Sequence, residues 1–137
     1  MRPMKKEVIL TDAAPPPRPG RTQAIRYGNL VFLSGQVPRD AHDHYITGDI
    51  QVQTRQVFEN LKAVLEAAGS SLDHLLKMSI FLRRISDYDA INQVFYEYVR
   101  DSPVARTCVQ AGELRSPGDI EIDVIAAVPD GASMPAR

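Results

Sequence analysis

The sequence Ile120-Glu121-Ile122-Asp123-Val124-Ile125-Ala126 alternates apolar and acidic side chains over its first five positions. In an extended strand, successive side chains point to opposite faces of the sheet. One face then carries Ile120, Ile122, Val124 and Ala126, and the other carries Glu121, Asp123, Ile125 and Ala127. The pattern predicts a strand with one apolar and one acidic face. Taken alone, it favours an ordinary half-exposed strand.

Further strands are expected upstream, at 7–10, 23–26, 30–34, 75–82 and 104–110. A turn at Gly28-Asn29 would join the second strand to the third. The apolar run Leu30-Val31-Phe32-Leu33 indicates a strand buried on both faces. The proline-rich segment 12–20 is unsuited to a helix or a central strand, and we interpret it as an extended linker.

Two helices are expected between these strands. An apolar stripe at helical spacing predicts the first over 49–68, and Gly69 is suited to end it. The stripe consists of Val57, Leu61, Val64, Leu65 and Ala68. Ser86 with Asp89 resembles a capping box and would begin the second helix, which continues to about Val99. Its inward residues would be Ile91, Phe95 and either Tyr98 or Val99.

The resulting order, β-β-β-α-β-α-β-β, predicts an α+β fold with two helices on one face of a mixed sheet. An uncovered, partly apolar sheet face on a small domain usually meets another subunit. The length of 137 residues suits a single domain, 1–137. Within it, residues 1–20 would form a short strand and the extended segment, and 21–129 the core.

Composition narrows the functional classes. Sixteen basic and 17 acidic side chains give a net charge of −1, without the basic surface that nucleic acid or an anionic membrane requires. We find neither a signal-peptide core nor an apolar run of about 18 residues for a membrane span, so a cytoplasmic location is expected. The single cysteine, Cys108, excludes an intrachain disulfide. No phosphate-binding loop or zinc-ligand pairing occurs, and no cofactor or metal is expected.

Arg106 is the strongest candidate for binding a substrate. It and Cys108 share one side of the strand at 104–110, and Thr107 points to the other. If this strand adjoins the final one, Arg106, Cys108 and Glu121 could meet at one rim. An arginine there can hold a carboxylate through two parallel hydrogen bonds, and a glutamate can position a water. A cross-strand ion pair between Arg106 and Glu121 is an equally good interpretation.

The remaining candidates are weaker. A lone cysteine such as Cys108 is more often a small buried hydrophobe than a nucleophile, although Arg106 could lower its pKa. His42 and His44 flank Asp43 in a polar loop, but three adjacent residues make no complete metal site. We interpret both histidines as solvated loop residues.

Several segments, taken together, resemble the RidA (YjgF-type) family of enamine/imine deaminases, also described as L-PSP endoribonuclease-like. They occur in the family's order and spacing over about 23–128. The segments are Ser34-Gly35-Gln36-Val37-Pro38, Gln53-Thr54-Arg55-Gln56 with Asn60-Leu61, Leu65-Glu66-Ala67-Ala68-Gly69, Asn92, Ala105-Arg106-Thr107-Cys108-Val109 and Ile120-Glu121-Ile122. Each is weak alone, and the set is specific.

The resemblance implies a chorismate-mutase-like fold, a homotrimer whose sheets form a central barrel, and sites in the clefts between subunits. It implies hydrolysis of short-lived 2-enamines or 2-imines to 2-keto acids and ammonia. Arg106 would hold the substrate carboxylate, and Glu121 would orient the attacking water. The cleft walls would come from Ser34-Gly35 and Thr107-Cys108, with Asn92 at a polar position on the second helix.

One position departs from the family pattern. Generalist deaminases of the family commonly carry a tyrosine where an ungapped alignment places Arg21. A second cation near Arg106 would favour a dicarboxylic substrate, whereas an Arg21 that points into solvent would have no such effect.

Two other functions compete with the deaminase. A non-catalytic regulator would use Arg106 to bind a small carboxylate, but it would not need Glu121 as well. A ribonuclease or translation inhibitor is disfavoured by the neutral charge and by the lack of a basic stripe with interleaved aromatics.

Overall fold

Six strands form one mixed sheet in the computed structural model, which describes residues 4–129. The strands are β1 (Lys6–Ile9), β2 (Ala24–Tyr27), β3 (Leu30–Leu33), β4 (Leu75–Leu82), β5 (Ala105–Gln110) and β6 (Ile120–Ala127). The helices are α1 (Ile50–Ala67) and α2 (Tyr88–Tyr98), with short 3-10 turns η1 (Leu72–His74) and η2 (Ile85–Asp87). Residues 1–3 and 130–137 of the expected domain 1–137 lie outside the described residues.

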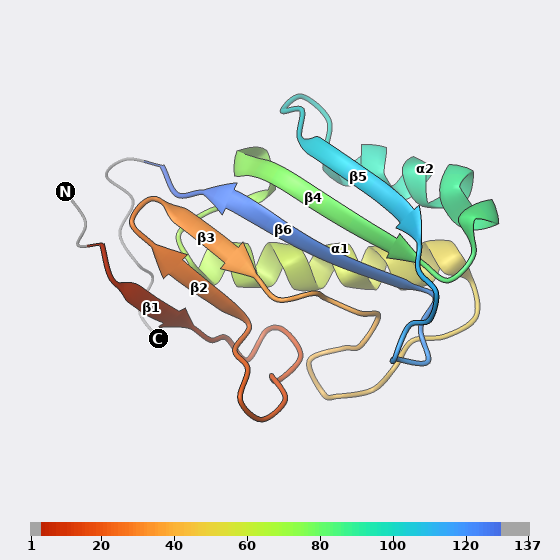
Figure 1. Ribbon diagram of the computed structural model, residues 1–137, viewed down its shortest axis with the longest axis horizontal. Helices are drawn as coiled ribbons and strands as arrows, with labels where there is room; N and C mark the ends of the chain where they lie inside the picture. The colour runs from red at the N-terminus through yellow and green to blue at the C-terminus, as the bar shows by residue number, and fades with distance from the viewer. Residues whose placement is uncertain (1–3, 130–137) are drawn as a thin grey trace.

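The strand order is β1-β2-β3-β6-β4-β5 (Figure 1). All neighbours are antiparallel except β4 and β5, which run parallel because α2 forms the crossover between them. The last two strands are therefore not neighbours, since β4 lies between β5 and β6. The expectation that they might adjoin is wrong, because strand pairing is set by contacts distant in sequence.

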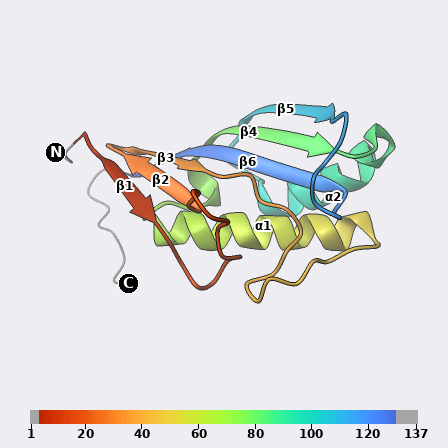
Figure 2. The same cartoon turned by 60° about the horizontal axis from the view of Figure 1, so that its bottom comes forward.

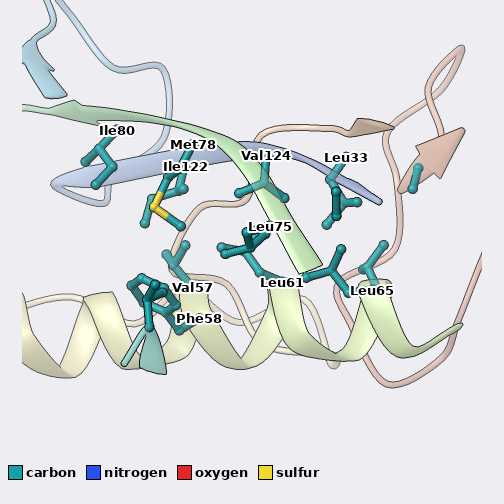
Figure 3. Packing of buried hydrophobic residues seen from close by; sticks show 14 of the residues in the cluster. Leu33, Val57, Phe58, Leu61, Leu65, Leu75, Met78, Ile80, Ile122 and Val124 are labelled. Carbon is teal, nitrogen blue, oxygen red and sulfur yellow. The ribbon is translucent and has the colours of Figure 1, made fainter. Parts of the chain in front are cut away.

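Both helices pack on one face of the sheet and leave the other face open (Figure 2). The core lies between the sheet and α1, where Leu61 and Leu65 point toward the sheet residues Leu33, Leu75 and Val124 (Figure 3). Burying such a leucine stabilises the fold by about 1.5–3 kcal/mol. The expected α+β arrangement, with two helices on one face of a mixed sheet, is confirmed.

The first helix begins and ends within one residue of the expected range 49–68. The Asp49 carboxylate caps the N-terminus of α1 by accepting hydrogen bonds from the backbone N–H groups of Gln51 (2.8 Å) and Val52 (3.1 Å). At the other end, Gly69 has a positive φ of 83°, the left-handed conformation that favours glycine after a helix.

The start of the second helix differs from the expectation. Residues Ile85–Asp87 form the turn η2, so Ser86 lies within this turn, and Asp87 precedes α2 without a side-chain capping bond. The capping box of Ser86 and Asp89 is therefore wrong. Ile91, Phe95 and Val99 are buried, as the helical spacing predicted.

The strand β3 is also less buried than its apolar run suggested. Val31 and Leu33 face the core, but Leu30 and Phe32 are 40% and 42% exposed on the open face. Because two helices cover one face of the sheet and nothing in residues 4–129 covers the other, alternate residues of this strand stay exposed.

Candidate functional site

Arg106 lies on β5, at the end of the sheet beside α2, and its guanidinium is held by uncharged side chains. Nη1 donates a hydrogen bond to Oδ1 of Asn92 (2.7 Å), and Nη2 donates to the hydroxyl of Tyr88 (3.1 Å). The guanidinium carbon also lies 4.6 Å from the centre of the Phe95 ring. These contacts fix the orientation of the guanidinium.

The positive charge of Arg106 has no acidic partner among residues 4–129. The ion pairs found in this part of the chain join other residues, and the expected alternative, a pair of Arg106 with Glu121, does not form. Two N–H donors are engaged by Asn92 and Tyr88, and the remaining ones are free to bind an anion. A fixed, uncompensated guanidinium of this kind suits a carboxylate.

Glu121 lies on β6, half-buried on the open face of the sheet. Burial raises the pKa of its carboxyl group above the ordinary value, and the neighbouring charge of Asp123 raises it further. A carboxyl group with a raised pKa and no basic partner in the described residues is typical of a general base.

Gly35 is held directly against Glu121. Gln36 and Ile122 exchange two backbone hydrogen bonds of 2.8 and 3.0 Å, which bind the segment after β3 to β6. A β-carbon at Gly35 would collide with Oε2 of Glu121 and lie 3.0 Å from its carboxyl carbon. The glycine is therefore needed for the close approach of these two segments.

The start of β6 is fixed by the residue before it. The carboxylate of Asp119 accepts hydrogen bonds from Gln53 on α1 (2.9 Å) and from Arg83 after β4 (3.1 Å). These contacts tie the strand that carries Glu121 to both layers of the fold.

Ser34, Gly35 and Arg21 lie together. They line one cavity of about 100 Å³ between the proline-rich segment and the chain after β3. The Ser34 hydroxyl donates a hydrogen bond to the carbonyl of Thr22 (2.7 Å). This bond links the chain after β3 to the segment that carries Arg21.

The structure thus separates the candidate residues into two groups, which lie on opposite faces of the sheet. Arg106 contacts Asn92 of α2 on the helix-covered face, whereas Glu121 and Gly35 lie on the open face. Within one chain the expected meeting of Arg106, Cys108 and Glu121 at one rim is wrong. Arg21 is not beside Arg106 either, because it precedes β2, four strand spacings or about 19 Å from β5.

The two other residues expected at the cleft, Cys108 and Thr107, lie on different faces of the sheet. Cys108 shares the helix-covered face with Arg106, and burial raises the pKa of its thiol against the smaller opposing effect of Arg106. Thr107 points to the open face, where its hydroxyl accepts a hydrogen bond from Lys77 (2.8 Å). This arrangement supports Cys108 as a wall residue rather than a nucleophile.

Sequence reasoning missed Tyr88 and Phe95 as partners of Arg106. Both lie on the face of α2 that carries Asn92, at a spacing of three or four residues, which places them side by side. This spacing was visible in the sequence, but the position of α2 over β5 was not.

The histidine-containing loop is structural. His42 and His44 are exposed, and their backbone N–H groups donate to Asp40. In residues 4–129, no three His, Cys, Asp or Glu side chains are grouped to hold a metal ion. The helices of the same part are too short or too polar to cross a bilayer.

Comparisons with known proteins identify the family. The family model described as Endoribonuclease L-PSP matches residues 11–128. The chain is 41% identical to the 3-aminoacrylate deaminase RutC of Acinetobacter baylyi, over 91% of this chain and 100% of that one. It is 36% identical to a 2-iminobutanoate/2-iminopropanoate deaminase of Dermatophagoides farinae, over 90% and 97%. The crystal structure of yeast Mmf1 superposes with a TM-score of 0.89, at 31% identity over 91% and 100%.

The chain therefore belongs to the Endoribonuclease L-PSP family, which is the RidA (YjgF) family of the sequence resemblance. Its fold is that of the RidA proteins, and its relatives include proteins named as enamine or imine deaminases.

Proposed function

We propose that this protein hydrolyses reactive 2-enamines and their 2-imine tautomers to 2-keto acids and ammonia. The observation that carries the proposal is the guanidinium of Arg106, which is oriented by Asn92, Tyr88 and Phe95 and has no acidic partner in residues 4–129. Such a group is prepared to bind the carboxylate of a 2-imino acid. The names of two relatives support this substrate class.

In the proposed mechanism, Arg106 holds the substrate carboxylate, and Glu121 accepts a proton from a water as its oxygen attacks the C=N carbon. The protonated Glu121 then gives its proton to the nitrogen of the resulting carbinolamine. The C–N bond breaks, and ammonia leaves as the hydroxyl group loses its proton and the C=O bond forms. Water is the sole co-reactant. The raised pKa of Glu121 brings its basicity closer to that required near neutral pH.

We further propose that a site is completed by two copies of the chain. Arg106 and Glu121 lie on opposite faces of one sheet, so one copy supplies Arg106 and a neighbour supplies Glu121. The open face offers an interface, because Leu30, Phe32 and Val109 are each about 40% exposed there. A homotrimer in which the edge strand β5 of one copy lies against the open face of its neighbour would cover the apolar residues and bring Arg106 to Glu121. The single cysteine needs no oxidising compartment, which supports a cytoplasmic location.

A coupled assay tests this function. A serine or threonine dehydratase generates the 2-enamine, and keto-acid release is followed with and without the protein. We expect acceleration by the wild type and its loss in Arg106→Ala. If the wild type gives no acceleration while small carboxylates still raise its melting temperature, the protein is a carboxylate-binding regulator instead.

A further inference from the structure

The cavity beside Gly35 carries an excess of positive charge. Arg18, Arg21 and Arg39 all line it, together with Ser34 and Gly35. Gly35 is also the residue that lies against the Glu121 carboxyl group. Gly35 therefore belongs both to the wall of this cavity and to the surroundings of the Glu121 carboxyl group, where the water attack is proposed.

Two of the three arginines of this cavity share one carboxylate. Asp43 accepts a hydrogen bond of 2.6 Å from Arg39, and it pairs with Arg18 at 3.2 Å. Arg21 is exposed, and neither a hydrogen bond nor an ion pair of its side chain occurs within residues 4–129. Asp43 thus pairs with two of the three guanidinium groups, and Arg21 supplies a charge that no described acid compensates.

A buried donor in the same wall also lacks a partner. Arg39 is 8% exposed, and its Nε has no hydrogen-bond partner in the described part of the chain, although Nη2 donates to the carbonyl of Pro16. The backbone N–H of Gly35, which lies outside the helices and strands, also has no backbone acceptor among residues 4–129. Both donors belong to residues that line the cavity, so an anion that reaches them there gains hydrogen bonds.

We propose that this cavity binds a second acidic group of the substrate, so that the enzyme prefers dicarboxylic 2-imino acids. The inference rests on the proposed function. The attacked carbon of a 2-imino acid carries a carboxylate, which Arg106 holds, the nitrogen, and a side chain. With Glu121 beside Gly35, that side chain extends into the arginine-lined cavity, and about 100 Å³ has room for a terminal carboxylate.

The reaction itself is unchanged by this assignment. Water adds to the C=N bond of 2-iminosuccinate or 2-iminoglutarate, and ammonia leaves to give the 2-keto dicarboxylic acid. The enzymes that supply such a substrate would be those that oxidise acidic amino acids, or that eliminate water from 3-hydroxy acidic amino acids. A monocarboxylic imine would leave the charge of Arg21 without a partner and would bind more weakly.

The test compares two imines made in the same way. An amino-acid oxidase converts aspartate or glutamate to the dicarboxylic imine and 2-aminobutyrate to the monocarboxylic one, and the hydrolysis of each is followed in the presence of the protein. For the wild type, we expect kcat/KM to be about tenfold or more higher on the dicarboxylic imine. Arg21→Gln should remove this preference, and Arg21→Lys should keep most of it.

The control is Arg100→Gln. This change removes an exposed arginine just after the C-terminal end of α2 and should leave both rates unchanged. If the wild type hydrolyses both imines equally, or if Arg21→Gln slows both equally, the cavity assignment is wrong and the deaminase function stands. If neither imine is hydrolysed faster than in buffer, the proposed function fails, and this inference fails with it. Binding of succinate and butyrate, measured by melting temperature, should show the same dependence on Arg21.

Discussion

At Gly35, the absence of a side chain has a direct consequence for the neighbouring carboxyl group. We expect Gly35→Ala to reduce kcat/KM at least tenfold, because the added methyl group occupies the place of Oε2 of Glu121 and forces that side chain to turn. The melting temperature should change little, since Gly35 is exposed and the Glu121 side chain can move. Kinetics and a thermal melt of the same sample measure both effects.

The matched control is Gly112→Ala. Gly112 is also an exposed loop glycine, and a β-carbon there meets nothing within 4 Å. The Gly112→Ala variant should therefore keep both the activity and the melting temperature of the wild type. Equal activity of Gly35→Ala and the wild type would show that the position of Glu121 does not matter to the reaction.

The proposed role of Glu121 as a general base predicts that the activity depends on pH. Its raised pKa means that the acidic limb of the rate profile should lie above the ordinary glutamate value of 4.5. Burial is the larger cause and the charge of Asp123 the smaller, so Asp123→Asn should move this limb to lower pH without abolishing it. A profile of kcat/KM between pH 4 and 8, on the same substrate, checks the direction.

The same shift affects stability. Because the folded pKa is raised, Glu121 favours the folded state below the ordinary glutamate pKa, and this contribution is lost as pH rises through the folded pKa. Glu121→Gln should therefore raise the melting temperature at pH 7 and have a smaller effect at pH 4. An increase that is the same at both pH values would assign the effect to packing instead of charge.

Among the elements, α2 determines the orientation of the site. We expect Asn92→Ala to raise KM about tenfold with a smaller change in kcat, because Arg106 keeps its charge but loses a hydrogen-bond partner that fixes its direction. Steady-state kinetics on the proposed substrate separate the two constants.

Gln93→Ala provides the comparison on the same helix. Gln93 is exposed and accepts a hydrogen bond from Gln51 on α1, so its loss weakens the contact between helices without touching Arg106. A KM that rises as much in this variant as in Asn92→Ala would point to movement of the whole helix.

The helix α1 depends on its cap for part of its stability. Asp49→Ala removes the acceptor for two backbone N–H groups and should destabilise the protein by about 1 kcal/mol. Asp49→Ser, which can still cap, should recover most of the loss. Urea unfolding at neutral pH measures all three proteins, and equal midpoints for wild type and Asp49→Ala would contradict the role of the cap.

The elements could be predicted from sequence where their signals are local. The stripe from Val57 to Ala68 and the alternation from Ile120 to Ala126 each report a periodicity that the backbone itself imposes. They correctly assigned one face of α1 and both faces of β6. The start of α2 was wrong, since the turn η2 takes up the residues that resembled a cap.

The arrangement of the site was not predictable in the same way. Nothing local to Arg106 or Glu121 specifies that β4 lies between their strands, because that order depends on pairing between distant segments. The sequence placed Arg106 and Cys108 on the same side of β5, but it could not show that this side is covered by α2. The partners Tyr88 and Phe95 remained hidden for that reason.

At the scale of the whole molecule, the proposed trimer predicts complementation between inactive variants. Arg106→Ala and Glu121→Gln subunits are each expected to be inactive alone. In a mixed trimer, one site combines an intact Arg106 with an intact Glu121 from a neighbour, so unfolding and refolding an equal mixture should restore about a quarter of the wild-type activity. Kinetics after refolding, with light scattering to measure the mass, test this.

Each variant refolded alone is the control. Restoration by the mixture would show that the two residues act across an interface. If the mixture stays as inactive as its components while light scattering shows trimers, the site lies within one chain and the proposed assembly of the site is wrong.

The division of the site between the two faces of one sheet links catalysis to mass action. In the proposed assembly, a free chain carries both Arg106 and Glu121 but holds no complete site, since the sheet separates the two groups. Turnover per chain should then fall as the protein is diluted below its dissociation constant, and it should recover on concentration. A newly made chain would not hydrolyse imines until it assembled with other copies. The concentration of this protein in the cell would then determine both the number of sites and the fraction of them that are active.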